Sequence, residues 1–444
     1  MSGAPQVVTY SFAQDGPAGW AAFNTTQQAA TRQALAAWDA ASGLSFVQVP
    51  DRPGGAGIDL RFRFEPMAGP SVLGEASLPP DGDVALNVDL FRTDLLTPHP
   101  VRISHQVLLH EIGHALGLSH PFADTAEAKA NTIMVATLGR AQVSNALLPW
   151  DQAAISALYG TPQLEAALGL NWSWDAALGA VRGQGTARAD SLNGTAYRDA
   201  LFAGAGNDVL NGFAGDDRLV PGAGDDVVAG GAGWDTLVLH SHRVGLRLDP
   251  AGAVDSADGR DRFSGIEAIE LLDGTLYLAP PSGLAELVGL YAEVLGRAPD
   301  AGGLAFWWQD WQAAPDLARI AGRFMASSEY QAAPRGMPAE ELALRAQQHD
   351  SAAAFAAGIW LPDAQALLTA RLYELVLGRD PDAEGFAFWT AHLDAGVDPL
   401  VIAATILASP EASTRAQPWP DAAALLEAAR ASMWAHDTNG VTFI

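Results

Sequence analysis

A nine-residue period in residues 185–238 constrains the fold of this chain more than any other feature. Each copy is long enough for one turn and one short strand, so consecutive turns fall on opposite sides. Stacked neighbours are then alternate copies, and the sequence predicts a parallel solenoid. An aliphatic residue takes the eighth position of every copy and is expected to be buried between two sheets. The sixth position is always aspartate: Asp190, Asp199, Asp208, Asp217, Asp226 and Asp235.

Two pairs of these aspartates have the surroundings of a calcium site. Asp208 stacks with Asp226, and Asp217 with Asp235, in copies that carry glycine at the fourth position. Glycine lets backbone carbonyls turn inward, and Ca²⁺ takes six to eight oxygen ligands. Carboxylates stacked this closely repel each other without a cation. We expect calcium at both pairs; the alternative is an ion-free acidic solenoid. The first two copies lack the glycine, so complete sites are not expected there.

The segment HEIGHALGLSH, residues 110–120, has the spacing of a zinc site. His110 and His114 lie one helical turn apart and can chelate one metal ion, while Glu111 projects to one side and can reach a metal-associated water. Gly117 allows the chain to leave the helix in a left-handed turn, which brings His120 back as the third ligand. Three protein ligands with an open fourth position are typical of catalytic zinc. The alternative is a solvated helix face whose histidines bind nothing.

Composition excludes several classes of partner. The chain has 51 acidic and 25 basic residues, a net charge of −26, which argues against nucleic acid and against anionic membrane surfaces. No apolar run is long enough to span a bilayer. The absence of cysteine excludes disulfides, a thiolate nucleophile and Cys-ligated zinc. The start MSGAPQVVTYSF has neither the form of a Sec signal peptide nor that of a propeptide, so neither is expected.

A second, longer repeat occupies the last part of the chain. LYAEVLGRAPDAGGLAFWW from Leu290 matches LYELVLGRDPDAEGFAFWT from Leu372, and the same offset pairs Trp307 with Trp389. Each copy is expected to be helical, and the two tryptophans are expected to lie in cores. The functional alternative is adhesion to an extracellular glycan or surface protein.

These patterns predict a multidomain protein. The first domain is expected to be α+β, with a mixed twisted sheet and three helices: one near residues 25–41, one near 101–116, and one after Asp151, with Asp151 as its N-cap and Gly160 as its stop. A parallel solenoid and all-α C-terminal repeats follow. The expected domains are 1–165, 166–282, 283–345 and 346–420, followed by a tail at 421–444.

The zinc segment resembles the metzincin signature, HExxHxxGxxH followed by a methionine turn, with Met134 of NTIMVA in the turn position. Pro121 and the order of the parts are similar to the serralysin branch, over residues 6–275. The resemblance implies a zinc endopeptidase with Glu111 as general base and polypeptide substrates added to the edge strand that begins at Gly74. Serralysins usually carry tyrosine where this chain has Ala136, so oxyanion stabilisation is expected from zinc and backbone N–H groups.

The nonapeptides resemble RTX repeats, which implies a parallel β-roll that binds two or more Ca²⁺ ions. Proteins of that kind leave the cell through a type I ABC-transporter apparatus, directed by an uncleaved C-terminal signal, to which the terminal VTFI is similar. The roll would remain unfolded where calcium is scarce and fold outside the cell. The helical copies resemble a domain of uncharacterised function that is common in secreted RTX proteins.

Three functions fit these features. The first is a secreted zinc endopeptidase. The second is a surface or adhesion protein whose metzincin-like domain keeps zinc but turns over poorly, because Ala136 replaces tyrosine. The third is a purely structural calcium-binding protein. Intact Glu111 favours the first, because a site that has lost its activity has no need of a base.

Overall fold

A computed structural model describes residues 6–432 apart from short gaps; the described ranges are 6–69, 71–79, 82–99, 102–137, 143–241, 246–249, 252–279, 281, 283–297, 299, 301–332, 336–348, 358–362, 364–379, 383–394, 396–415 and 418–432. The end of the predicted secretion signal, residues 433–444, lies outside them. The chain divides into two compact units, Met1–Asp235 and Thr236–Ile444. None of the helices in the described ranges combines the length and apolar character that a bilayer crossing requires.

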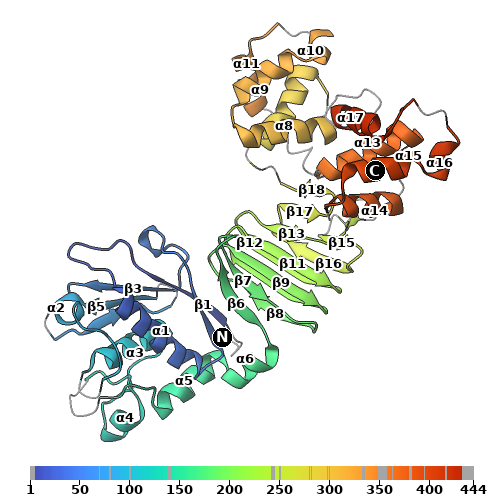
Figure 1. Cartoon of the computed structure of the whole chain (residues 1–444). Coiled ribbons are helices and arrows are strands. Elements are labelled where there is room, and N and C mark those ends of the chain that lie inside the picture. Colours follow the sequence, from blue (N-terminus) through green and yellow to red (C-terminus); the bar gives the residue numbers. More distant parts are fainter. Residues whose placement is uncertain are drawn as a thin grey trace. The chain divides into compact units, whose positions relative to one another are not determined.

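The first unit begins with a five-stranded mixed sheet (Figure 1). Its strands, in the spatial order β2-β1-β3-β5-β4, are β2 Leu44–Gln48, β1 Gln6–Phe12, β3 Leu60–Glu65, β5 Asp83–Asn87 and β4 Gly74–Ala76. All neighbouring pairs are parallel except β4–β5. Leu60, Phe62 and Phe64 alternate along β3 and enter the main core of the unit. The short antiparallel strand β4 therefore forms one edge of the sheet.

Six helices of the first unit lie within the described residues. They are α1 Thr25–Asp39, α2 Val88–Phe91, α3 Ser104–Ala115, α4 Ala126–Asn131, α5 Pro149–Tyr159 and α6 Pro162–Leu168. Of these, α1, α2 and α3 contact strands of this sheet. Asn24 and Gln27 form a capping box at the start of α1, and Trp38 near its end is fully buried. The three predicted helices correspond to α1, α3 and α5, and the α+β class is confirmed. The predicted domain boundary at 165 falls inside α6.

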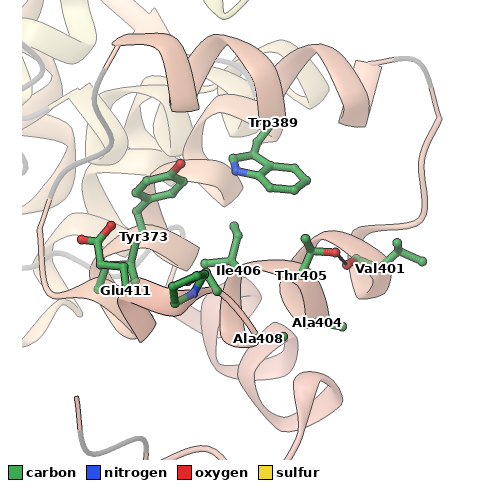
Figure 2. A pocket seen from close by; sticks show the side chains of 11 residues that line it. Tyr373, Trp389, Val401, Ala404, Thr405, Ile406, Ala408 and Glu411 are labelled. Carbon is green, nitrogen blue, oxygen red and sulfur yellow. Dashed lines mark hydrogen bonds between the residues drawn. The ribbon is translucent and has the colours of Figure 1, made fainter. Parts of the chain in front are cut away.

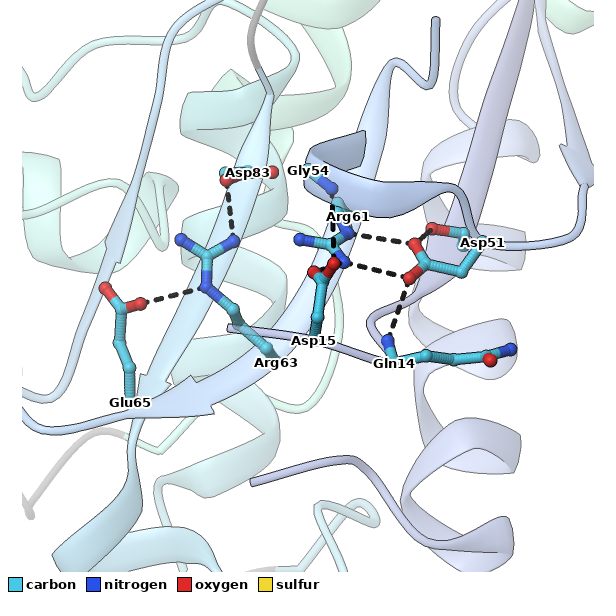
Figure 3. Close-up of polar contacts among 9 residues, drawn as sticks. Gln14, Asp15, Asp51, Gly54, Arg61, Arg63, Glu65 and Asp83 are labelled. Carbon is cyan, nitrogen blue, oxygen red and sulfur yellow. Dashed lines mark hydrogen bonds and ion pairs between the residues drawn. The ribbon is translucent and has the colours of Figure 1, made fainter. Parts of the chain in front are cut away.

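Arg61 of β3 holds two loops beside the sheet, and Arg63 of the same strand pairs with Glu65 of β3 and Asp83 of β5 (Figure 3). Buried Arg61 donates to both carboxylate oxygens of Asp51, at 2.9 and 2.8 Å, and also contacts Asp15. Burial alone would raise the pKa of Asp51, but the hydrogen bonds from Arg61 and Ser11 hold it below its ordinary value. Because the charge of Arg61 is matched, a guanidinium can occupy the interior and fix the segments that follow β1 and β2. A short 3₁₀ turn, η1 Pro53–Gly55, lies between β2 and β3.

The nonapeptide block of the first unit forms two sets of parallel strands. Its strands, after the antiparallel hairpin of β6 Asn171–Asp175 and β7 Ala180–Gln184, are β8 Ser191–Asn193, β9 Asp199–Ala205, β10 Val209–Ala214, β11 Arg218–Ala223 and β12 Val227–Ala232. One set pairs β8, β10 and β12, and the other pairs β7, β9 and β11. The repeat strands pair with those of alternate copies, as when Val209 lies opposite Ser191 and Val227. The eighth-position residues Leu192, Leu201, Leu210, Leu219 and Val228 are buried as expected.

A small apolar cluster joins the first sheet to the start of the repeats. Val7 of β1 and Val47 of β2 lie in it with Val181 of β7 and Tyr197. The guanidinium of Arg52 lies over the Tyr197 ring, 3.3 Å from its centroid. The first coils of the repeat block are therefore packed against the α+β domain by apolar and cation–π contacts.

The second unit begins with further strands: β13 Thr236–Val238, β14 Arg247–Asp249, β15 Ala253–Asp255, β16 Arg260–Ser264, β17 Ala268–Leu271 and β18 Gly274–Tyr277. A later strand, β19 Ile359–Pro362, pairs antiparallel with β18. The prediction that the C-terminal repeats are all-α is wrong at this point. Ile359 and Leu361 alternate into the apolar cluster of the first helices, and β19 pairs the free edge of β18.

Two sets of helices complete the second unit. The first set is α7 Leu284–Leu290 with a π-helical turn η2 Tyr291–Leu295, α8 Ala301–Ala313, α9 Leu317–Met325, α10 Ser328–Ala332 and α11 Ala339–Gln348. The second set is α13 Ala364–Leu377, α14 Ala383–Asp394, α15 Pro399–Leu407, α16 Pro410–Ser413 and α17 Ala422–Ser432. The starts of α14, α15 and α16 follow those of α8, α9 and α10 at the offset that separates Leu290 from Leu372. The predicted boundary at 345 falls inside α11.

The two tryptophans expected in the cores differ in burial. Trp307 of α8 is 4 % exposed and belongs to the core of the first set. Trp389 of α14 is only partly buried and packs at the margin of the core of the second set. The prediction is therefore confirmed for Trp307 and only partly for Trp389.

Candidate metal centres

Helix α3 fixes two imidazoles before any metal is considered. The ring nitrogen Nδ1 of His110 lies 2.8 Å from the carbonyl oxygen of Ile133, and Nδ1 of His114 lies 2.7 Å from that of Leu118. A carbonyl oxygen only accepts, so each Nδ1 carries the proton and each Nε2 keeps its lone pair. This second layer of hydrogen bonds is the usual way to orient metal-binding histidines.

The three Nε2 atoms of His110, His114 and His120 converge on one point, with pairwise distances of 3.0 to 3.1 Å. Tetrahedral zinc with bonds of 2.0–2.1 Å places its nitrogen ligands about 3.3 Å apart. Burial, opposed by the hydrogen bond to Ile133, lowers the pKa of His110 to about 4, so its ring is neutral as a metal ligand requires. The triad can bind metal, and its donor set and spacing fit zinc.

The turn after α3 explains how the third histidine reaches the other two. Gly117 has a φ of 94°, in the left-handed region, and its N–H donates to the carbonyl of His114 at 2.8 Å. The N–H of Leu118 donates to the carbonyl of Gly113 at 2.9 Å. These bonds reverse the chain within one turn, and they also present the Leu118 carbonyl to the His114 ring.

Glu111 lies beside the edge strand of the sheet. It is 6 % exposed, and burial followed by the nearby Glu75 carboxylate raises its pKa to about 7. A Cβ atom on Gly74, the first residue of β4, would lie 2.8 Å from Glu111 Cγ. Glycine at this position therefore allows β4 to approach α3 closely. No sequence pattern singles out this contact, because the two residues are far apart in the chain.

The methionine turn supports the underside of α3. Met134 is buried, and a Cβ atom on Gly113 would lie only 2.6 Å from its sulfur. Buried Asp151 of α5 accepts from the N–H of Ile133 at 3.0 Å and also from the Thr132 hydroxyl. Ile133 in turn presents its carbonyl to His110. Asp151 therefore anchors the segment that orients the first histidine.

The prediction that Asp151 is an N-cap is wrong. Helix α5 begins at Pro149 with Leu148 as N-cap, and Asp151 is the third helical residue. Its carboxylate accepts from the Leu148 N–H at 2.8 Å and also from the methionine turn, so it serves two segments at once. Gly160 ends the helix as expected.

Ala136, two residues after Met134, is exposed, and its methyl side chain cannot donate a hydrogen bond to an oxyanion. Its N–H donates to Asp124 at 3.1 Å, and the N–H of Thr137 donates to the same carboxylate at 2.9 Å. Asp124 thus ties the end of the methionine turn to the loop that follows His120. Sequence reasoning missed Asp124, because nothing in its local pattern marks it.

In the repeat block the sixth-position aspartates form rows that link neighbouring coils. Asp226 Oδ1 accepts from the N–H of Asp208 at 2.7 Å, and Asp235 Oδ1 accepts from that of Asp217 at 3.0 Å. The Oδ2 atoms of Asp208 and Asp217 are buried and have no hydrogen-bond partner among the described residues. Burial raises the pKa of Asp217 to about 7, and the nearby Asp235 charge acts in the same direction. The hydrogen bond from the Asp199 N–H opposes both effects but is weaker. A buried carboxylate oxygen without a donor is costly, so these atoms fit a cation.

The fourth-position glycines give these rows their spacing. Gly215 and Gly224 have φ values of 129° and 142°. A Cβ atom on Gly224 would lie 1.7 Å from the carbonyl oxygen of Gly206 in the neighbouring coil. Only glycine permits this stacking of turns.

In the first two copies, the aspartate carboxylates accept hydrogen bonds from the chain itself. Asp190 Oδ2 accepts from the N–H and hydroxyl of Thr186, at 2.6 and 2.8 Å. Asp199 Oδ2 accepts from the N–H and hydroxyl of Thr195, at 2.6 and 3.1 Å. Threonine at the second position of these copies supplies the donors that the later copies lack. This fits the expectation that complete calcium sites do not form there.

Three family models match parts of the chain. A Matrixin family model matches residues 4–160, and an RTX calcium-binding nonapeptide repeat model in four copies matches residues 184–219 and 211–240. A domain of unknown function (DUF4214) matches residues 369–416, within the second set of helices. No curated protein matches the chain.

The Matrixin match and the histidine triad point to a zinc metalloprotease domain, followed by calcium-binding repeats of a kind typical of secreted proteins. Taken in their order along the chain, the three matches fit a serralysin-like protein.

Proposed function

We propose that the first domain is a zinc endopeptidase of the serralysin branch that hydrolyses extracellular polypeptides. The observation that carries the proposal is the convergence of three Nε2 atoms within 3.1 Å, with Glu111 on the neighbouring position of the same helix. Two of the three imidazoles are held in place by backbone carbonyls, and the carboxylate is buried beside them.

Zinc held by His110, His114 and His120 would supply a Lewis acid for a water molecule and for the carbonyl oxygen of the peptide bond. Glu111 takes a proton from that water at a carboxylate oxygen and returns it to the leaving nitrogen. Its burial suits this exchange, because a carboxylate shielded from solvent holds a proton more readily. With Ala136 in place of tyrosine, backbone N–H groups share the stabilisation of the oxyanion with the metal.

Strand β4 supplies the binding surface for the substrate backbone. It pairs with β5 on one side and ends the sheet on the other, so its outer backbone groups can pair with an extended peptide. Gly74 brings this edge against Glu111, so a peptide added to β4 passes the base.

The repeats are proposed to form a parallel β-roll that folds when calcium fills the rows of Asp208 with Asp226 and Asp217 with Asp235. Folding outside the cell, after export through a type I ABC-transporter apparatus, would keep the chain threadable during passage. The two helical sets are proposed to be copies of one domain, on the basis of the constant offset between their helices.

A second candidate is a weakly active surface or adhesion protein. It is favoured by Ala136, whose exposed methyl group cannot donate to an oxyanion. Both candidates bind zinc and calcium, and they differ in turnover.

Digestion of a peptide library by the wild type and by Glu111→Gln tests the proposal. The wild type should cleave internal peptide bonds, while Glu111→Gln should retain one zinc ion and lose cleavage. His114→Ala should lose both zinc and cleavage. Equal cleavage by the wild type and Glu111→Gln would overturn the assignment of the base, and full zinc in His114→Ala would overturn the ligand set.

A further inference from the structure

The second set of helices contains a hollow of about 910 Å³ (Figure 2). Tyr373 of α13 and Trp389 of α14 lie on either side of it, with Ile406 of α15 between them. The remaining apolar lining consists of Leu377, Val401, Ala404, Ala408 and Pro410. This is an aromatic-walled pocket that lies outside the metal centres.

The first set of helices shows what fills the equivalent space. The Phe324 ring lies 4.4 Å from the Trp307 ring and 5.1 Å from the Tyr291 ring, between centroids. At the repeat offset, the equivalent residues of the second set are Ile406, Trp389 and Tyr373. The second set therefore keeps both aromatic walls and lacks the phenyl ring between them.

The second set also lacks a positively charged side chain that the first set has beside the equivalent tryptophan. The Arg323 guanidinium lies 5.1 Å from the centroid of the Trp307 ring, and its equivalent in the second set is Thr405. The adjacent pair Arg323 and Phe324 has thus been replaced by a smaller, uncharged pair. Both replacements enlarge the space in front of Trp389.

The frame around the pocket is preserved. Arg297 donates to both carboxylate oxygens of Glu329 at 2.6 and 2.9 Å, and Arg379 donates to those of Glu411 at 2.6 and 2.8 Å. These two ion pairs occupy equivalent positions of the two sets. The two aromatic walls and the ion pair beside them therefore recur in the second set, while the residues between the walls differ.

We propose that this pocket binds an aromatic side chain carried by a basic segment of a partner polypeptide. The first set provides the template, because an Arg-Phe pair of the chain itself occupies the same frame. Charge favours such a partner, since the chain carries a net charge of −26 and none of the described residues that line the pocket is basic. Tyr373 and Trp389 then flank the incoming ring as Tyr291 and Trp307 flank Phe324.

A sugar fits the pocket less well, because three of the polar side chains that line the pocket are already engaged within the protein. The Thr405 hydroxyl donates to the carbonyl of Val401 at 2.7 Å, and the Ser409 hydroxyl accepts from the Ala412 N–H at 3.1 Å. Glu411 is paired with an arginine. A sugar needs several hydrogen-bonding groups from its site, whereas an aromatic ring needs the two walls.

Titration of the full-length protein with N-acetyl-Arg-Phe-amide, followed by saturation-transfer NMR, tests the proposal. The aromatic protons of the peptide should receive saturation. Affinity should fall about threefold for N-acetyl-Glu-Phe-amide, because a cation beside tryptophan is modestly favourable. N-acetyl-Arg-Leu-amide, methyl glucoside and toluene serve as comparators for the ring, for a sugar and for a free aromatic molecule.

Two variants refill the pocket with the residues of the first set. Ile406→Phe alone and Thr405→Arg with Ile406→Phe should each weaken peptide binding at least tenfold while leaving the circular dichroism unchanged. The control is Leu400→Ala, which alters an exposed residue of the same helix that does not line the pocket. Absence of binding by the wild type, or equal binding by the refilled variants, would overturn the proposal. Preference for methyl glucoside or for toluene over the peptide would overturn the assigned ligand.

Discussion

The zinc triad and the aspartate rows are both metal sites, but the protein prepares them differently. The His110 and His114 rings are held by backbone carbonyls at their far nitrogens, so their positions do not depend on an ion. In the repeats, the Oδ2 atoms of Asp208 and Asp217 are buried without donors among the described residues. We therefore expect zinc to complete a site which the fold already provides, and calcium to complete the fold of the repeats themselves.

Calcium depletion should produce the largest effect. In calcium-free buffer with free zinc held constant, we expect the full-length protein to lose part of its β signal in far-UV circular dichroism, because the carboxylate rows then repel. Millimolar calcium should restore the signal, and magnesium should not, since it demands a smaller octahedral shell. The double variant Asp217→Ala with Asp226→Ala should need a much higher calcium concentration to recover its β signal. Glu127→Ala, which removes one exposed charge, is the control, and an unchanged spectrum without calcium would contradict the contrast between the two kinds of site.

Zinc chemistry should be separable from stability. Glu111→Gln should reduce kcat/KM by about 10²–10⁴-fold, the usual contribution of a general base. Its unfolding midpoint should stay near that of the wild type, because the substitution leaves the imidazoles and their carbonyl partners in place. Activity assays and thermal unfolding check the two halves. A large fall in the unfolding midpoint would show that the stability of the zinc site depends on the Glu111 side chain, against the proposal.

Gly113→Ala tests whether the support of the zinc helix is rigid. The added methyl group would meet the Met134 sulfur at 2.6 Å, so the turn must shift. We expect a loss of about 1–3 kcal/mol in the free energy of unfolding, typical of overpacking. Urea unfolding measures it. Gly69→Ala is the matched control, because an added Cβ there has no atom within 4 Å among the described residues. Equal effects of the two substitutions would show that the methionine turn can shift at no cost in stability.

Thr195→Val tests the contrast within the repeats themselves. It removes a hydroxyl that donates to the buried Asp199 carboxylate, at an expected cost of about 1–2 kcal/mol in the free energy of unfolding. The loss should be the same with and without calcium, because this turn relies on the chain for its donors. Thr195→Ser keeps the hydroxyl and should recover most of the stability. A loss seen only in calcium would place an ion at Asp199.

The smallest effect is expected at Ala136. If the oxyanion relies on zinc and backbone groups, Ala136→Tyr should raise kcat by severalfold at most, and Ala136→Phe, which has no hydroxyl, should not. Steady-state kinetics on one peptide substrate compares them. No gain from the tyrosine would place position 136 away from the scissile bond.

Sequence predicted the features that depend on spacing along one segment. The triad follows from the helical turn and Gly117, and the stacking of alternate copies follows from the nonapeptide period. What it missed depends on contacts between distant segments. Asp151 serves the methionine turn through bonds to Thr132 and Ile133, and β19 was missed because its partner β18 lies far earlier in the chain. Local patterns carry no record of such partners.

The threonine-supported turns give the repeat block two unlike ends. Each coil of a solenoid is stabilised by its nearest neighbours, so ordering spreads outward from whichever coils form first. Here Thr186 and Thr195 complete the first two turns from the chain alone, and the Tyr197 cluster attaches them to a folded neighbour. We therefore expect them to act as a nucleus from which ordering proceeds in one direction. The number of ordered coils would then rise step by step with calcium concentration. The length of the ordered part of the repeat block would therefore depend on the calcium concentration around it.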